Sequence, residues 1–240
     1  MRSSVAAAVA VSAIVAGCGR VHAENGGQTI SRNYQVGNFQ AIEVAGPYDV
    51  EVRTGGNPSV SGRGSEKVLE RTVVEVRGDK LVIRPEKKGW FGGSWSSKGK
   101  ASFTVTVPRL QAAAIAGSGD IRVDRVQGGD FKGAVAGSGD IRVAAIDVDS
   151  LQISIAGSGD VTAGNGRAQS ARYDIAGSGD IDAASVTATD ARVSIAGSGN
   201  VRVNATGTAD VRIVGSGDVD VKGGAKCNVK KSGSGEVRCS

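Results

Sequence analysis

Large aromatic side chains, proline and histidine are all scarce in this chain. Aromatic residues make up 4% of the 240 residues, there are 4 prolines, and the only histidine is His22. A globular core usually relies on aromatic and leucine side chains, whereas valine, isoleucine and alanine carry the apolar share here, which favours thin, stacked strands. His22 lies in the leader, so the rest of the chain has no histidine for a catalytic triad or a general base.

Cysteine and clustered positive charge are also limited. The 3 cysteines form no Cys-x-x-Cys pair and no cysteine–histidine cluster, so no zinc site and no cofactor are indicated. The formal charge is +5, from 29 basic and 24 acidic residues. The repeats described below contain no basic run interleaved with stacking aromatic residues. Nucleic acid is therefore not an expected partner.

The first 23 residues have the features of an export signal. Arg2 is followed by an apolar stretch from Val5 to Val15, which is too short to span a bilayer as a mature helix. Residues 15–18, Val-Ala-Gly-Cys, resemble a lipobox, in which Cys18 would carry lipid and become the new N-terminus. The alternative is cleavage after Ala23. We expect an outer-membrane or periplasmic protein held to the membrane by this lipid, with a soluble periplasmic or secreted protein as the alternative.

The two remaining cysteines are candidates for a disulfide. Lipidation of Cys18 would leave Cys227 and Cys239 as a pair in an oxidising compartment. Alignment with the earlier repeats puts Cys239 at the inward position of Val123 and Cys227 at that of Ala171. A disulfide that closes the last coil is therefore predicted, and two buried free thiols are the alternative.

The tripeptide Gly-Ser-Gly occurs seven times at nearly constant spacing. Its first glycine stands at Gly117, Gly137, Gly157, Gly177, Gly197, Gly215 and Gly233, so the spacing is 20 residues four times and then 18 residues twice. A fixed period with a glycine-rich corner and β-branched flanks is typical of a solenoid. The sequence predicts an all-β, single-stranded parallel β-helix-like solenoid over residues 108–240, with coils of about 20 residues.

Apolar and polar residues alternate on both sides of each corner. Residues 151–155, Leu-Gln-Ile-Ser-Ile, precede one corner, and residues 121–123, Ile-Arg-Val, follow another. This alternation indicates strands with one buried face. A weaker third apolar position follows at Val126, Ile146 and Val186. Each coil is therefore expected to hold two clear short strands and a weaker third.

A short polar residue follows each corner. It is aspartate at Asp120, Asp140, Asp160, Asp180 and Asp218, with Asn200 and Glu236 as variants. Such a side chain can accept a hydrogen bond from a nearby turn N–H. Stacked coils lie about 4.8 Å apart, so the column also brings like charges together. Arginines two residues further on would offset this repulsion; they are Arg122, Arg142, Arg202 and Arg238.

The portion from 24 to 107 is a divergent β-region. Residues 44–52, Val-Ala-Gly-Pro-Tyr-Asp-Val-Glu-Val, are a degenerate copy of the repeat, and Gly78-Asp79 indicates a hairpin turn. Residues 64–71 could hold a short helical turn. A basic loop at 87–100 carries Trp90, Phe91 and Trp95. It could bind a membrane surface, a sugar or a partner protein, or it could cover the open end or flank of the solenoid, which we favour.

Several features together resemble the bacterial head GIN domain family, whose members are described as auto-transporter adhesins. They are residues 39–46, Phe-Gln-Ala-Ile-Glu-Val-Ala-Gly, then Leu81-Val82-Ile83, the Val-Thr-Val-Pro-x-Leu phrase at 105–110, and the Gly-Ser-Gly-Asp ladder. The resemblance covers about residues 39–220. It implies a right-handed, single-stranded β-helix-like domain in an exported protein, and it implies no catalytic residues.

Three functions are compatible with these features. The first is a non-enzymatic cell-envelope module, structural or adhesive, that binds a glycan or an envelope protein through an exposed row of Arg122, Arg142 and Arg202. The second is a carbohydrate-active enzyme, although its carboxylates are repeated rather than unique. The third is calcium binding along the aspartate column, although the period and the position of the aspartate differ from the nonapeptide calcium repeats. We expect the first.

Overall fold

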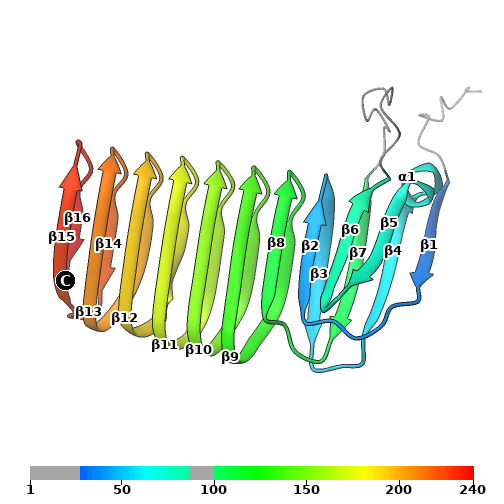
Figure 1. The fold of residues 1–240 in the computed structure, drawn as a ribbon, viewed down its shortest axis with the longest axis horizontal. Coiled ribbons are helices and arrows are strands. Elements are labelled where there is room, and N and C mark those ends of the chain that lie inside the picture. The colour runs from blue at the N-terminus through cyan, green and yellow to red at the C-terminus, as the bar shows by residue number, and fades with distance from the viewer. Residues whose placement is uncertain (1–27, 87–99) are drawn as a thin grey trace, which may run out of the picture.

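The described residues wind into a single β-solenoid (Figure 1). The computed structural model describes residues 28–86 and 100–240, so the export signal with Cys18 and the aromatic residues Trp90, Phe91 and Trp95 lie outside the described residues. One 16-stranded sheet surrounds a continuous apolar core, and its regular part contains about six coils. The all-β solenoid with coils of about 20 residues is therefore confirmed.

The elements follow the chain with one short helix among them. In order they are β1 (Thr29–Tyr34), β2 (Ala41–Ala45), β3 (Tyr48–Thr54), β4 (Ser59–Ser65), α1 (Glu66–Glu70), β5 (Thr72–Arg77), β6 (Lys80–Pro85), β7 (Ala101–Val107), β8 (Ala112–Gly117), β9 (Ile121–Gly137), β10 (Ile141–Gly157), β11 (Val161–Gly177), β12 (Ile181–Gly197), β13 (Val201–Gly215), β14 (Val219–Lys222), β15 (Lys226–Ser232) and β16 (Val237–Cys239). Within the described ranges, no helix is long and apolar enough to cross a membrane.

Each regular coil is one long strand that bends around the core. The strands β9 to β12 have 17 residues each and pair in parallel with their neighbours, so that Ile141 lies between Ile121 and Val161. The two or three short strands expected in each coil are thus continuous. The predicted third apolar position is buried at Val126, Ile146 and Val186.

The core consists of three inward-facing groups per coil. In the coil that begins at β10 the buried side chains are Ile141 and Val143, then Ile146 and Val148, then Leu151, Ile153 and Ile155. Because a strand places alternate side chains on opposite faces, each short apolar group points inward while the residues between it and the next group face solvent or form the bends. The sequence alternation therefore predicts the core directly.

The shorter last coils keep their inward set. The register between β12 and β13 shifts between Ala183 and Thr187 and again between Ala188 and Asp190, where the missing residues fall. Beyond the shift, Ala209, Val211 and Ile213 are again fully buried. The deletion is absorbed on one side of the coil, so the corner and its flanking strands are unchanged.

The N-terminal portion continues the same stack. In the coil formed by β2 and β3, Val44 pairs with Ile115 and Val50 pairs with Ile121, both in parallel. Residues 44–52 therefore occupy the place of a regular repeat, as predicted. The following coil in the sequence, β6 with β7, lies on the opposite side of β2 and β3. The chain thus goes backwards by one coil before it turns forward into β8.

Antiparallel strands close the N-terminal end of the stack. β5 pairs with β6 through the predicted hairpin at Gly78-Asp79, while β4 covers β7 and β1 covers β4. The predicted helical turn is α1. These strands take up the backbone groups that a parallel coil would otherwise leave unpaired.

Candidate functional site

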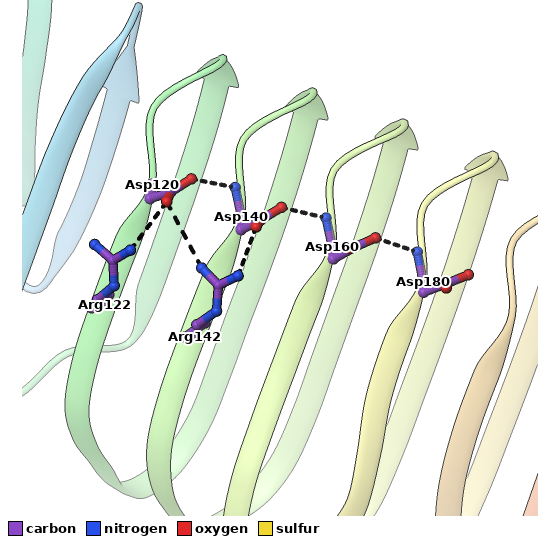
Figure 2. A network of polar contacts seen from close by, with 6 residues as sticks. All are labelled: Asp120, Arg122, Asp140, Arg142, Asp160 and Asp180. Atoms are coloured by element: carbon purple, nitrogen blue, oxygen red, sulfur yellow. Dashed lines mark hydrogen bonds and ion pairs between the residues drawn. The ribbon is translucent and has the colours of Figure 1, made fainter.

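The corner aspartates form a ladder of hydrogen bonds that runs along the solenoid (Figure 2). Asp140 N–H donates to Asp120 Oδ1 at 3.1 Å, Asp160 N–H donates to Asp140 Oδ1 at 2.9 Å, and Asp180 N–H donates to Asp160 Oδ1 at 2.8 Å. Each aspartate therefore accepts from its own counterpart in the next coil. The predicted role as an acceptor is correct, but the donor is one coil away and not in the same turn.

The two variant residues continue this ladder. Asn200 N–H donates to Asp180 Oδ1 at 2.7 Å, and Asn200 Oδ1 accepts from Asp218 N–H at 3.1 Å. An asparagine has the same short carbonyl acceptor as an aspartate. Glu236 N–H donates to Asp218 Oδ1 at 2.8 Å, while its own carboxylate contacts Arg238 at 3.1 Å. In the described structure no coil follows Glu236, so a longer side chain is accommodated there.

The arginines of the predicted binding row contact carboxylates. Arg122 lies 3.3 Å from Asp120, and Arg142 bridges Asp140 at 2.9 Å and Asp120 at 3.8 Å (Figure 2). Arg202 instead contacts Asp182, at 3.2 Å, in the preceding coil. All three arginines occupy equivalent outward positions, but Thr162 and Asp182 stand between Arg142 and Arg202 in that column. The row therefore contains charges of both signs and is not uniformly basic.

The ladder geometry bears on the calcium hypothesis. One carboxylate oxygen of each of Asp120, Asp140, Asp160 and Asp180 already accepts a backbone N–H. Among the described residues, no group of three or more histidine, cysteine, aspartate or glutamate side chains is placed to hold a metal ion. The corner column is thus a structural hydrogen-bond ladder.

A second polar surface lies on the side of the coil before the corner. An open groove of about 360 Å³ crosses adjacent coils and is lined by Arg172, Arg192, Asp190 and Asp210, among others. Arg172 and Arg192 are paired neighbours in the sheet. Arg172 Nε donates to Asp174 at 2.6 Å, whereas Arg192 lies 3.6 Å from Asp210. Hydroxyl groups of Ser170 and Thr208 complete the lining.

Sequence reasoning did not single out this groove. Arg172 and Arg192 stand at the same place in consecutive repeats, five residues before the corner, and that recurrence was the available signal. Asp210 stands at the same place in the next repeat and pairs in register with Arg192, whereas Asp190 pairs with Thr208 next to the register shift, so its approach to the arginines depends on the fold.

The last coil carries the predicted disulfide. Cys227 pairs in register with Ala209 and Cys239 with Val221, both inward positions, and the structure joins the two sulfur atoms. The bond links β15 to β16 across the end of the coil. Because this end is not covered, Cys239 is exposed and Cys227 is half-buried rather than fully buried.

The fold and the corner ladder define a β-solenoid with a repeated polar surface. The family model for "Putative auto-transporter adhesin, head GIN domain" matches residues 38–225. The chain belongs to this family, which confirms the resemblance seen in the sequence. Its members are adhesin-like β-solenoids of unknown function.

Solved structures of similar proteins share this fold. A putative adhesin from Bacteroides fragilis has a TM-score of 0.79 at 22% identity, covering 89% of this chain and 97% of that one. A putative lipid binding protein from Parabacteroides distasonis has a TM-score of 0.71 at 26% identity, covering 90% and 98%. A putative adhesin from Parabacteroides merdae has a TM-score of 0.66 at 19% identity, covering 89% and 97%. No curated protein matches this sequence.

Proposed function

We propose that this protein is a non-enzymatic adhesion module of the cell envelope that binds an extended polymer, such as a glycan, along the side of its solenoid. The observation that carries the proposal is the groove across neighbouring coils, which presents Arg172, Arg192, Asp190 and Asp210 next to hydroxyl groups. A polymer lying across the coils would meet side chains at equivalent positions of neighbouring coils, at a spacing of about 4.8 Å. Family membership and the adhesin-like solved structures support the same function.

The groove and the arginine row beside the corner can be tested against each other. Arg172→Ser with Arg192→Ser removes two guanidinium groups from the groove, and Arg122→Ser with Arg142→Ser is the matched change in the row. Beads coated with each full-length variant would be mixed with isolated envelope polysaccharide. We expect the groove variant to lose most of its binding and the row variant to keep it. Equal binding by the groove variant and the unchanged protein would contradict binding of the polysaccharide in the groove. Loss of binding only in the row variant would assign binding to Arg122 and Arg142.

We further propose that lipid on Cys18 anchors the module to the membrane. The support is the apolar segment from Val5 to Val15 that leads into a lipobox-like sequence. Intact mass of the protein from fractionated cells tests this. A chain that begins at Cys18 with added acyl mass, in the membrane fraction, is the expected result. A chain that begins at Glu24 in the soluble fraction would contradict the anchor and make the module a diffusible binder.

A further inference from the structure

The two ends of the solenoid are finished differently. At the N-terminal end, antiparallel strands β5, β4 and β1 cover the outermost coil. At the C-terminal end, β15 pairs only with β13 and β16 pairs only with β14 among residues 28–86 and 100–240. Figure 1 shows β15 and β16 as the outermost strands at that end. Their free backbone donors and acceptors form an edge on which another strand can pair.

This C-terminal edge, residues 222–240, is strongly basic. It contains five basic residues and one acidic residue, a net charge of +4 in a chain whose total formal charge is +5; the basic residues are Lys222, Lys226, Lys230, Lys231 and Arg238. Glu236, the acidic residue, is already paired with Arg238. Lys226 and Lys230 are exposed. A partner on this edge would gain from negative charge.

A lysine at an inward register position distinguishes this edge from the coils behind it. Lys231 pairs in register with Ile213, at a position that is isoleucine in the three coils before it. Its ammonium group donates to the carbonyl oxygen of Gly235 at 3.0 Å. Lysines along an edge, one of them at an inward register position, discourage a strand from pairing with its own copy, because two such ends would bring like charges together. The edge is therefore unsuited to a second copy of this chain.

The edge is nevertheless ordered and partly apolar. The disulfide between Cys227 and Cys239 holds β15 and β16 together. Val229, which pairs with the buried Val211, is 42% exposed because no coil lies over it. A rigid strand edge with an exposed apolar side chain can receive an added strand at a low cost in ordering.

We propose that the C-terminal edge binds an acidic, extended segment of another protein, which adds to β15 as a further strand. The partner's backbone would satisfy the free N–H and C=O groups, its carboxylates would face Lys226 and Lys230, and its apolar residues would cover Val229. A charged lipid surface would satisfy the lysines alone. This site shares no residue with the side groove, although Lys226 pairs in register with Thr208 of that groove. The proposal goes beyond the adhesion function and does not depend on it.

The test uses a fluorescently labelled synthetic peptide of alternating glutamate and valine, and the full-length protein with its disulfide intact. We expect fluorescence anisotropy to report binding that weakens as salt is raised. Hydrogen exchange should slow in the backbone of residues 226–232. Lys226→Glu with Lys230→Glu should weaken binding roughly tenfold or more. Arg125→Glu with Lys132→Glu, the same charge change on exposed residues of β9, should leave it unchanged.

Several results would overturn the proposal. They are no peptide binding, equal losses in the two double variants, and binding without protection of residues 226–232. Binding of the protein to phosphatidylglycerol vesicles, lost in the Lys226→Glu and Lys230→Glu variant while the peptide fails to bind, would replace the acidic strand with an anionic membrane surface. Hydrogen exchange of the core strands checks that every variant is folded.

Discussion

At the scale of single residues, one carboxylate oxygen per coil satisfies one backbone N–H of the next coil. The corner leaves this N–H without a partner in its own turn, and a short acceptor fixed at the corner reaches it. Asp160 and Asn200 are equally suitable because each has the same short carbonyl acceptor. Glu236 occurs only where the described stack ends.

This role predicts a graded response at Asp160. Asp160→Ala leaves the backbone N–H of Asp180 without its acceptor and should lower the free energy of unfolding by about 1 kcal/mol. Asp160→Asn keeps the acceptor and should cost much less. Urea unfolding of the three proteins measures both effects. Glu236→Ala is the control, because no described backbone N–H donates to its side chain, which contacts only the exposed Arg238 among the described residues. A loss there as large as in Asp160→Ala would contradict the ladder.

The buried tyrosine Tyr173 predicts how stability depends on pH. Burial raises the pKa of the Tyr173 hydroxyl above its ordinary value of 10.0, so the folded protein keeps the proton after the unfolded chain has lost it. The contribution of Tyr173 to the free energy of unfolding should therefore be constant below about pH 9 and should fall as pH rises through about 10 and above. Tyr173→Phe should make this fall shallower.

Unfolding measured from pH 8 to 11 tests the alkaline fall. Some of the slope should remain in Tyr173→Phe, because burial also raises the pKa values of Tyr34 and Tyr48. Identical slopes for the variant and the unchanged protein would show that Tyr173 is not held neutral by burial.

The sequence predicts that these residues accept hydrogen bonds or form ion pairs, but it does not predict which residues are their partners. The Gly-Ser-Gly-Asp pattern indicates a short acceptor at a tight corner, but its donor lies 20 residues away and is found only from the stacking register. The arginine row shows the same limit. Arg122 and Arg142 contact the expected aspartates, whereas Arg202 follows Asn200 and contacts Asp182 of the preceding coil instead.

At the scale of elements, the corner brings backbone against backbone. A Cβ atom added at Gly159 would collide with the carbonyl oxygen of Gly139 in the coil below, because successive corners stack in direct contact. This contact explains why the corner repeats glycine while the strands on either side vary among several apolar residues. It also makes the corner of each regular coil intolerant of a larger residue.

Gly159→Ala should lower the free energy of unfolding by about 2 kcal/mol or more, because the neighbouring backbone must shift to admit the methyl group. Gly129→Ala is the matched control, since a Cβ atom there has no neighbour within 4 Å. Thermal unfolding compares the two variants. Similar melting temperatures for both would contradict the close stacking of the corners.

The arrangement of the N-terminal elements was only partly predictable. The degenerate copy at 44–52, the hairpin at Gly78-Asp79 and the helical turn all follow from local patterns, and each is present. The placement of β6 and β7 outside β2 and β3 could not be predicted from local patterns, because their pairing joins segments far apart in the sequence. Pairing between distant parallel strands has no local turn to fix it.

At the scale of the whole molecule, the stack is a rod whose sides and end present different surfaces. The sides carry rows with charges of both signs and the groove at Arg172 and Arg192, while the C-terminal edge carries most of the net positive charge. Six steps between the regular corners span roughly 29 Å. A rigid rod of this kind suits repeated weak contacts with a polymer, which together give useful affinity.

The proposed function requires the full-length protein to bind an envelope polymer without cleaving it. The most direct measurement passes the protein over immobilised envelope polysaccharide and follows two quantities, the protein retained and the chain length of the polysaccharide afterwards. We predict retention with no change in chain length. Shortened polysaccharide would show an enzyme, and no retention would show that the solenoid is not an adhesion module for this polymer.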